Sequence, residues 1–578
     1  MDCGELLKRG MDCQLSELLL EMSPEEQRKN VHVLYGSSRA VQETVLLEMI
    51  KSYRNTEFGL KHHFASIHSI EDYRKEVPLS EYEDYHNAID RLKKAESDIL
   101  FPGRATYFFL TSGTSGTHKY IPDTPREEMN RRLIVNLRFS EWADLLDKTQ
   151  EKYAREFADR IRMALVGKLQ ENAEVPDQAL IVFANSEGLQ STEGGILCGT
   201  ASSRTATGSG GALRPLYANP PILIEEYKGE DLRYMILRAA LPSSGIYAGI
   251  GNNAMSLAEL AECGQKYADE LIRDIREGTC RLAMSENVRT AMGNRLTPLP
   301  ERADYLAELA RKNRFIPKYY WPKFITASFW LGGSVGFFTD RIRQYVPENT
   351  RFIDAGYGSS EAKFNVPCEM ETPGGPLAVY TNFYEFQQED DEKILTADEL
   401  EQGKTYELYV TNNAGLYRYR MHDQVIVDGF TGGTPDIRFY TKSADIGNIA
   451  QEKIPGILMQ HVTMHALSAE GLEMTAVQVY PDLNQMKYIV CIETDNDKCM
   501  ACGLKEKTEE KIDEELMENP HYAIYRNNNA ILAPEVQWMK KGFGAYLIEE
   551  KSKIMSSTSQ VKVQVFTKAL PDERWFLK

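Results

Sequence analysis

Apolar residues in this chain occur in short runs that are separated by longer, charge-rich stretches. Strand-like runs lie at residues 107–110, 179–183, 234–237 and 351–354, and each is short enough for a buried strand. Residues 127–169 are rich in charge and carry apolar positions at a spacing near 3.6, which predicts one or two amphipathic helices. Strands that alternate with helices indicate a layered α/β core.

The first hundred residues have a helical pattern. Ser23 precedes Pro24 and two glutamates, and this order predicts a helix that begins at Pro24 with Ser23 as its cap. We therefore expect the chain to open with helices before it enters the α/β core.

The last part of the chain predicts a smaller α+β domain. Its strand-like runs lie at residues 476–480, 488–492 and 536–539. A strand-like run also ends just before Lys442, where the pattern changes. We therefore expect a large N-terminal domain over residues 1–441 and a small C-terminal domain over residues 442–578.

A loop rich in glycine and hydroxyl groups follows the first apolar run. Glycine lets the backbone come close to an anion, hydroxyls add hydrogen-bond donors, and Lys119 adds a positive charge. We interpret the segment as a phosphate-binding loop; an ordinary surface loop of the same composition is the alternative. It is not a Walker loop, because His118 precedes Lys119 and Tyr120 follows it. The candidate phosphate-binding residues are Thr111, Ser112, Gly113, Thr114, Ser115, Gly116 and Thr117.

Two later segments carry chemistry that suits a nucleotide. In the first, Tyr357 could stack on a base, Ser359 or Ser360 could bind a phosphate oxygen, and Glu361 could hold Mg²⁺. Gly358 permits a tight turn between them. The alternative is a turn at the end of a strand with an exposed glutamate.

The second segment, residues 415–423, ends at Asp423, whose carboxylate could accept both ribose hydroxyls. The alternative for this segment is a β-hairpin with an acidic turn.

Taken together and in this order, these segments resemble the adenylate-forming superfamily, and more closely the plant auxin-responsive Gretchen Hagen family of acyl acid amido synthetases. The resemblance covers nearly the whole chain. Further matching segments are residues 55–59, 77–84, 244–249, 274–278, 321–322, 332–334, 383–386 and 560–562. Two departures, His422 in place of a glycine and Val563-Gln564 in place of Pro-Arg, predict a distant member outside the plant hormone enzymes.

The resemblance implies an enzyme that uses ATP and Mg²⁺ to adenylate a carboxylic acid and then transfers the acyl group to an amine, expected to be an amino acid. It implies that residues 112–117 bind the β- and γ-phosphates, that Tyr357 contacts adenine, that Glu361 positions Mg²⁺ and that Asp423 holds the ribose. It also implies that the C-terminal domain is a lid that delivers Lys562 to the reacting groups. Lys119 and Lys562 are the two candidate catalytic residues.

The acyl-acid pocket is expected between the helical middle of the chain and the apolar segment that starts at Phe329. Phe329 and Trp330 could form apolar walls, and Gly332 and Gly333 would permit close approach of the backbone, with Ser334 beside them. Simple core packing is the alternative for each aromatic residue.

Two other functions stay open at this point. An acyl-CoA ligase would share the adenylation step and use a thiol acceptor. A catalytically silent protein would keep only the nucleotide or acyl pocket.

Composition narrows the class of protein further. A net charge of −18 argues against a nucleic-acid partner, because such proteins need a basic surface. Charges interrupt the first 22 residues, and the longest nearly apolar stretch, 325–338, is shorter than the roughly 20 residues of a membrane helix. Nine scattered cysteines favour a reducing compartment over a disulfide framework. We expect a cytoplasmic monomer with small-molecule substrates and neither nucleic acid nor membrane as a partner.

Overall fold

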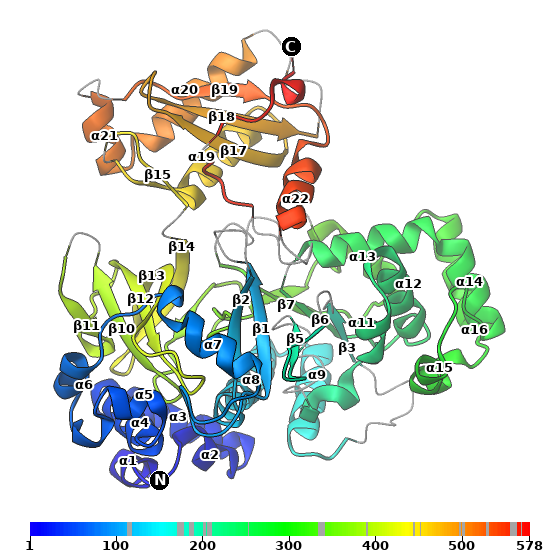
Figure 1. Cartoon of the computed structure of the whole chain (residues 1–578). Helices are drawn as coiled ribbons and strands as arrows, with labels where there is room; N and C mark the ends of the chain where they lie inside the picture. Colours follow the sequence, from blue (N-terminus) through cyan, green and yellow to red (C-terminus); the bar gives the residue numbers. More distant parts are fainter. Residues whose placement is uncertain are drawn as a thin grey trace. The chain divides into compact units, whose positions relative to one another are not determined.

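The computed structural model divides into two compact units (Figure 1). Unit 1 comprises Met1–Thr111, His118–Met421 and Val425–Phe439, and unit 2 comprises Ser112–Thr117, His422–Gln424 and Tyr440–Lys578. The structure describes the chain except for residues 113–117, 170–178, 184–189, 200–203, 205–210, 253, 333–341, 389–390, 443–444, 451, 496–498, 500–502, 528–530, 555–562, 568 and 578.

Unit 1 begins with helices, as predicted. The helix at Pro24 is confirmed: Ser23 and Glu26 form a reciprocal capping box at its start. These helices bury Leu6, Leu19, Leu34 and other apolar residues in the first of two hydrophobic cores of unit 1. They are α1 (Cys3–Gly10), α2 (Leu15–Leu20), α3 (Pro24–Tyr35), α4 (Ser38–Tyr53), α5 (Glu57–Lys61), η1 (Phe64–Ser66), α6 (Ile70–Glu76), η2 (Tyr82–Tyr85) and α7 (His86–Lys93).

The same core is shared with two sheets. The larger has the order β11-β10-β12-β13-β14-β9, and β10 pairs antiparallel with both β11 and β12. The smaller has the order β2-β1-β5-β4, with β1 parallel to β5. The strands are β1 (Tyr107–Ser112), β2 (His118–Asp123), β4 (Gln190–Ser191), β5 (Leu197–Gly199), β9 (Gly375–Pro376), β10 (Phe383–Gln388), β11 (Ile394–Thr396), β12 (Thr405–Thr411), β13 (Tyr419–Thr431) and β14 (Thr434–Lys442), and η9 (Ala397–Glu399) follows β11.

A four-stranded parallel sheet carries the second core of unit 1. Its order is β3-β6-β7-β8, and all neighbouring strands run in the same direction. The strands are β3 (Leu180–Phe183), β6 (Ala248–Gly251), β7 (Thr326–Phe329) and β8 (Arg351–Asp354). The strands expected at 179–183 and 351–354 are thus confirmed, as is the mixed α/β class.

The prediction of a strand at residues 234–237 is wrong, because these residues lie inside the helix α12 (Gly229–Ala240). The helix is buried from Tyr234 to Ala240, so a continuous apolar run is compatible with a helix here. Acidic residues in its first turn and Arg238 in its last turn are favourable helix-end charges that the pattern of apolar residues does not reveal.

Helices cover this parallel sheet. The other helical elements of the region are η5 (Gly211–Leu216), α11 (Ile222–Glu226), α13 (Met255–Lys266), α14 (Ala268–Glu277), α15 (Glu286–Met292), η6 (Gly293–Leu296), α16 (Pro300–Arg311), α17 (Pro317–Tyr320) and η8 (Arg343–Tyr345).

The long helix α8 (Pro125–Lys148) links the two cores of unit 1. The charge-rich stretch after residue 127 forms α8 and the helix α9 (Lys152–Leu165), as predicted. Leu133 and Leu137 of α8 pack into the first core, whereas Phe139 and Trp142 pack into the second. The helix α8 therefore has apolar side chains in both cores, and its polar side chains are held in place by this packing.

Unit 2 contains a three-stranded sheet of order β17-β18-β19, which confirms the three strands predicted near the C-terminus. Its elements are β15 (Ile446–Gly447), β16 (Ile454–Pro455), α19 (Gly456–Ala469), β17 (Met474–Asp482), β18 (Lys487–Thr494), α20 (Leu504–Leu516), α21 (Pro520–Asn527), β19 (Glu535–Trp538), α22 (Phe543–Ile554) and η11 (Glu573–Trp575). Among the described residues, no helix is both long and apolar enough to span a membrane. Whether unit 2 acts as a lid stays a prediction.

A buried cluster of charges stabilises the start of β13 in unit 1. Arg418, directly before the strand, donates two hydrogen bonds of 2.7 and 3.1 Å to the carboxylate of Glu385. Arg74 of α6 donates a third, of 2.8 Å. The side chains of Glu385 and Arg418 are 1% and 7% exposed.

We predict that Glu385→Ala lowers the free energy of unfolding by roughly 3–5 kcal/mol, because it leaves buried guanidinium groups without their counter-ion. The matched control is Asp428→Ala, which removes the partner of Arg438 from an ion pair that is 29% and 41% exposed. This control variant is expected to lower the free energy of unfolding by less than about 1 kcal/mol. Urea denaturation of the three proteins tests the prediction, and equal losses in both variants would contradict it.

Candidate functional site

Lys119 lies on β2 at the far side of the predicted phosphate loop. Its Nζ atom donates a 3.4 Å hydrogen bond to Tyr419 Oη and lies 5.1 Å from the centroid of the Tyr82 ring. The loop itself, Gly113 to Thr117, lies outside the described residues. Thr111 and Ser112 end β1 in the structure, so the loop leaves a strand as expected. Phosphate binding by this loop stays a prediction.

The second predicted segment forms a compact turn at the end of β8. Gly356 has φ +79°, a conformation that favours glycine, and directs the chain into the turn. The backbone N–H of Ser359 donates to the carbonyl of Ala362 at 2.9 Å, and that of Glu361 donates to Ser359 Oγ at 3.1 Å. The turn is therefore held by its own hydrogen bonds.

The ring of Tyr357 is packed among aromatic side chains. It is 4% exposed, stacks on Phe364 at a centroid distance of 4.4 Å and contacts Phe439 at 5.5 Å. Trp330 contacts the same Phe439 ring at 5.3 Å. The structure thus brings Tyr357 and Trp330, both predicted from the sequence, to one aromatic cluster. The expected contact with adenine stays a prediction.

The charge of Glu361 acts on Tyr419, the residue that accepts a hydrogen bond from Lys119. The backbone carbonyl of Glu361 accepts a 2.8 Å hydrogen bond from Asn412 Nδ2, which fixes the main chain. Burial raises the pKa of Tyr419 well above its ordinary value, and the negative charge of Glu361 contributes to that shift. Tyr419 therefore stays protonated, as a neutral partner of Lys119. Within the described residues, the Glu361 carboxylate has no hydrogen bond or ion pair.

The predicted acyl-pocket residues separate into two environments. Phe329, at the end of β7, is fully buried in the second core and contacts Phe183 at 5.9 Å. Trp330 packs against the first core instead. Gly332 lies next to the Trp330 indole, where an added Cβ would come within 3.0 Å of the ring nitrogen. Gly333 and Ser334 lie outside the described residues.

Asp423 is placed in unit 2 and is 2% exposed. It lies inside β13 rather than in an acidic turn, and it forms an ion pair with Lys442. The preceding His422 has φ +52°, a conformation that glycine adopts more easily. His422, which replaces the expected glycine, therefore still adopts the left-handed backbone conformation. Lys562 lies outside the described part of the chain.

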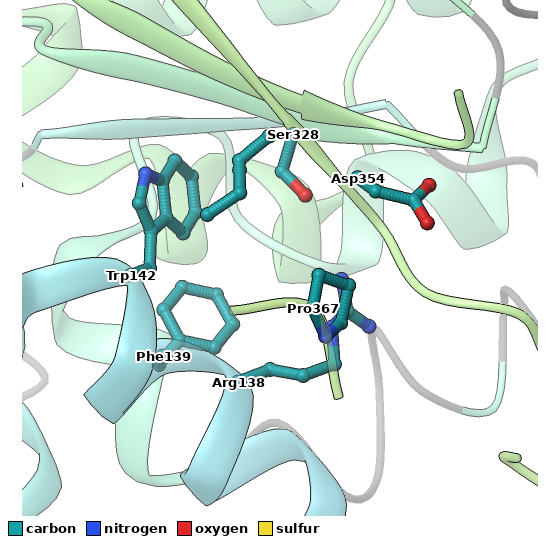
Figure 2. A pocket seen from close by; sticks show the side chains of 7 residues that line it. Arg138, Phe139, Trp142, Ser328, Asp354 and Pro367 are labelled. Carbon is teal, nitrogen blue, oxygen red and sulfur yellow. The ribbon is translucent and has the colours of Figure 1, made fainter. Parts of the chain in front are cut away.

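Two basic residues in unit 1 were not anticipated from the sequence. Arg138 of α8 lines a small cavity together with Phe139, Trp142, Ser328, Ile353, Asp354 and Pro367 (Figure 2). Lys363 follows the turn that starts at Tyr357, and its backbone forms a bridge with Gly358. Burial lowers the pKa of Arg138 to about 10 and that of Lys363 to about 8. Their spacing in the sequence gives no motif that could have identified them.

Family models place this chain among known proteins. The GH3 family N-terminal domain matches residues 28–351, the GH3 family central domain matches residues 375–442, and the GH3 family C-terminal domain matches residues 458–570. The chain belongs to the GH3 family, as the resemblance of its motifs predicted.

Characterised relatives are similar over most of their length. The 4-substituted benzoates-glutamate ligase GH3.12 of Arabidopsis thaliana is 25% identical over 85% of this chain and 84% of its own. The jasmonoyl-L-amino acid synthetase GH3.5 of Oryza sativa subsp. japonica is 25% identical over 75% of each chain. The solved structure of the GH3.15 acyl acid amido synthetase has a TM-score of 0.76 and 18% identity over 96% of both chains, which shows a common fold.

We predict that Lys119→Met weakens ATP binding roughly 10- to 100-fold, because one hydrogen bond to a charged group contributes about 1.5–3 kcal/mol. Lys404→Met is the control, since Lys404 pairs with Glu401 at the surface. Isothermal titration calorimetry with ATP compares the three proteins. An unchanged dissociation constant in Lys119→Met would remove Lys119 from the nucleotide site.

Proposed function

We propose that this protein is an ATP-dependent acyl acid amido synthetase. It adenylates a carboxylic acid, releases pyrophosphate and transfers the acyl group to an amine, most simply an amino acid. The observation that carries the proposal is membership of the GH3 family across all three of its domains. The names of the relatives, which join benzoates to glutamate or jasmonate to amino acids, support the same reaction class.

The chemistry overcomes two obstacles to making an amide from a free acid. A carboxylate carbon is electron-rich, and its oxygen is a poor leaving group. When a carboxylate oxygen attacks the α-phosphorus, pyrophosphate leaves and the acyl group becomes bonded to AMP. The amine then attacks the activated carbonyl, AMP leaves and a proton is lost from nitrogen. Such a reaction depends on alignment and charge neutralisation more than on covalent catalysis.

The roles proposed for unit 1 follow from where its side chains lie. Lys119 would face negative phosphate oxygens, because its hydrogen-bond partner Tyr419 is neutral and no described carboxylate forms an ion pair with it. Tyr357 would present its ring edge to the base, since Phe364 covers one face. Residues Ser112 to Thr117, which belong to unit 2, would bind the β- and γ-phosphates.

The residues around Glu361 fit a role in holding Mg²⁺. The carboxylate has no partner among the described side chains, and Asn412 fixes its backbone through a 2.8 Å hydrogen bond. Carboxylate oxygens are suitable ligands for this hard cation. When bound, Mg²⁺ would neutralise negative charge on the triphosphate. Ser359 would position Glu361 through the 3.1 Å hydrogen bond to its N–H.

Asp423 and Lys562 complete the proposal from unit 2. Asp423 would hold the ribose hydroxyls through the acceptor sites of its carboxylate that the ion pair with Lys442 leaves available. Lys562 would neutralise charge between the carboxylate and the α-phosphate. Movement of unit 2 between the two half-reactions would be a gating step of a common kind.

We predict that Lys562→Ala lowers acid-dependent exchange of pyrophosphate into ATP roughly 10- to 100-fold, because a charged group is lost at the reacting centre. ATP affinity is expected to stay nearly constant, since Lys119 and the loop remain. Lys541→Ala is the control on the same unit. Undiminished exchange in Lys562→Ala would remove this residue from the mechanism.

The acceptor is tested by product analysis. We expect mass spectrometry to detect an amide when the protein is given ATP, a panel of carboxylic acids and mixed amino acids, and a hydroxamate when hydroxylamine replaces the amino acids. A thioester formed with coenzyme A in place of any amide would instead identify an acyl-CoA ligase. Binding of ATP without turnover of any acid would identify a silent binding protein.

A further inference from the structure

A short segment near the end of the chain, residues 563–567, is fixed in unit 2 through its main chain. The carbonyl of Val565 accepts a 2.7 Å hydrogen bond from the N–H of Val479, and the N–H of Thr567 donates a 2.9 Å hydrogen bond to the carbonyl of Val479. Val479 lies in β17, an outer strand of the sheet of unit 2, and forms a parallel bridge with Phe566. The segment therefore extends this sheet by a short additional pairing.

The carboxylate of Asp445 binds two further N–H groups of the same segment. Its Oδ1 atom accepts a 2.9 Å hydrogen bond from the N–H of Phe566, and its Oδ2 atom accepts a 3.3 Å hydrogen bond from the N–H of Val565. Each oxygen thus accepts from one N–H group. Hydrogen bonds to an ionised acceptor are stronger than those between neutral groups, so Asp445 is a substantial restraint on the segment.

The position of Asp445 is itself set by the main chain on both sides. Its N–H donates a 2.9 Å hydrogen bond to the carbonyl of Lys442, and its carbonyl accepts a 2.8 Å hydrogen bond from the N–H of Gly456. The carboxylate also lies against Gly456, the first residue of α19, where an added Cβ would collide with it. The positive end of the helix dipole stabilises a carboxylate at this place. Asp445 therefore joins the chain that leaves β14 to the 563–567 segment.

We propose that Asp445 is a positioning residue for Lys562, because it fixes the segment from which this lysine extends. The inference rests on the proposed function of Lys562. The link between the two residues is the chain itself: Val565 follows Lys562 by three residues, so at most about 11 Å of extended chain joins them. Val563, directly after the lysine, packs against a separate small apolar cluster of unit 2.

Apolar packing and the carboxylate restrain the 563–567 segment in different ways. Val565 and Phe566 are 4% and 8% exposed and belong to the main core of unit 2, which keeps them out of water. That contact is non-directional. The two N–H bonds to Asp445 have a direction, so they fix where the segment lies along β17. A reacting group that is displaced by about 1 Å can lose roughly 100-fold in rate, so this restraint bears on the reaction.

The test measures the two half-reactions separately, with an acid that the native protein adenylates. Asp445→Ala is expected to lower kcat for acid-dependent pyrophosphate exchange about 10-fold and to leave the KM for ATP within about 2-fold. Amide formation from the synthetic adenylate of that acid and mixed amino acids should keep the native rate, because Lys562 is assigned to adenylation. The matched control is Asp482→Ala, which also removes a carboxylate that accepts two backbone N–H bonds, from Asn484 at 2.9 Å and Gln485 at 3.1 Å. This control should keep the native exchange.

Two further variants distinguish positioning from a general loss of stability. In a Lys562→Ala protein, adding Asp445→Ala should lower exchange by less than about 2-fold more, because the group that Asp445 positions is already absent. Gly456→Ala should also lower exchange, since the new Cβ displaces the Asp445 carboxylate, although alanine is the better helix former. Hydrogen exchange should be faster at the amides of Val565 and Phe566 in both Asp445→Ala and Gly456→Ala.

The outcomes separate this role from the proposed function. Equal losses in the two half-reactions, or fully additive losses in the double variant, overturn the positioning role and leave the proposed function standing. Native pyrophosphate exchange in Asp445→Ala, with faster hydrogen exchange at Val565 and Phe566, also overturns it, because the restraint then does not serve the lysine. Absence of pyrophosphate exchange by the native protein with any acid contradicts the proposed function, and the positioning role falls with it.

Discussion

The buried ion cluster of Glu385 with Arg74 and Arg418 is the interaction on which the site in unit 1 depends. Arg418 also donates a 2.8 Å hydrogen bond to the carbonyl of Val77, and its own carbonyl accepts one from the N–H of Ser80. These bonds fix the main chain directly before Tyr419. Since Tyr419 accepts the hydrogen bond from Lys119, a charge cluster outside the site helps to determine where the proposed phosphate-binding lysine lies.

Charge is distributed unevenly in this acidic protein. The net charge is −18, yet Lys119, Arg138 and Lys363 are partly buried in unit 1 without a carboxylate hydrogen-bonded to them among the described residues. Structural cations are treated differently, as Arg131 and Arg418 show with their bonded carboxylates. Of the first group, Lys119 is the one to which the proposed function gives an anionic ligand; its described contacts are Tyr419 and Tyr82.

Much of the fold could be predicted from local patterns. The cap at Ser23, the helices after residue 127 and the strands at both ends of the chain follow rules that act within a few residues. The helix at 234–237 was mistaken for a strand because burial on all sides removes the alternation that separates the two. The candidate turn at Tyr357 could be recognised from its residues, whereas Arg138 borders a cavity whose lining comes from α8, β7, β8 and Pro367, which only tertiary structure brings together. No spacing in the sequence encodes that cavity.

The central claim is that the acid becomes bonded to AMP before it meets the amine. It is tested by supplying an acid that supports amide formation with ¹⁸O in its carboxylate and analysing the nucleotide product by mass spectrometry. The account predicts AMP that carries one labelled oxygen, because a carboxylate oxygen stays on the α-phosphorus when the amide forms. Formation of ADP with the label in inorganic phosphate, or AMP without label, would contradict it.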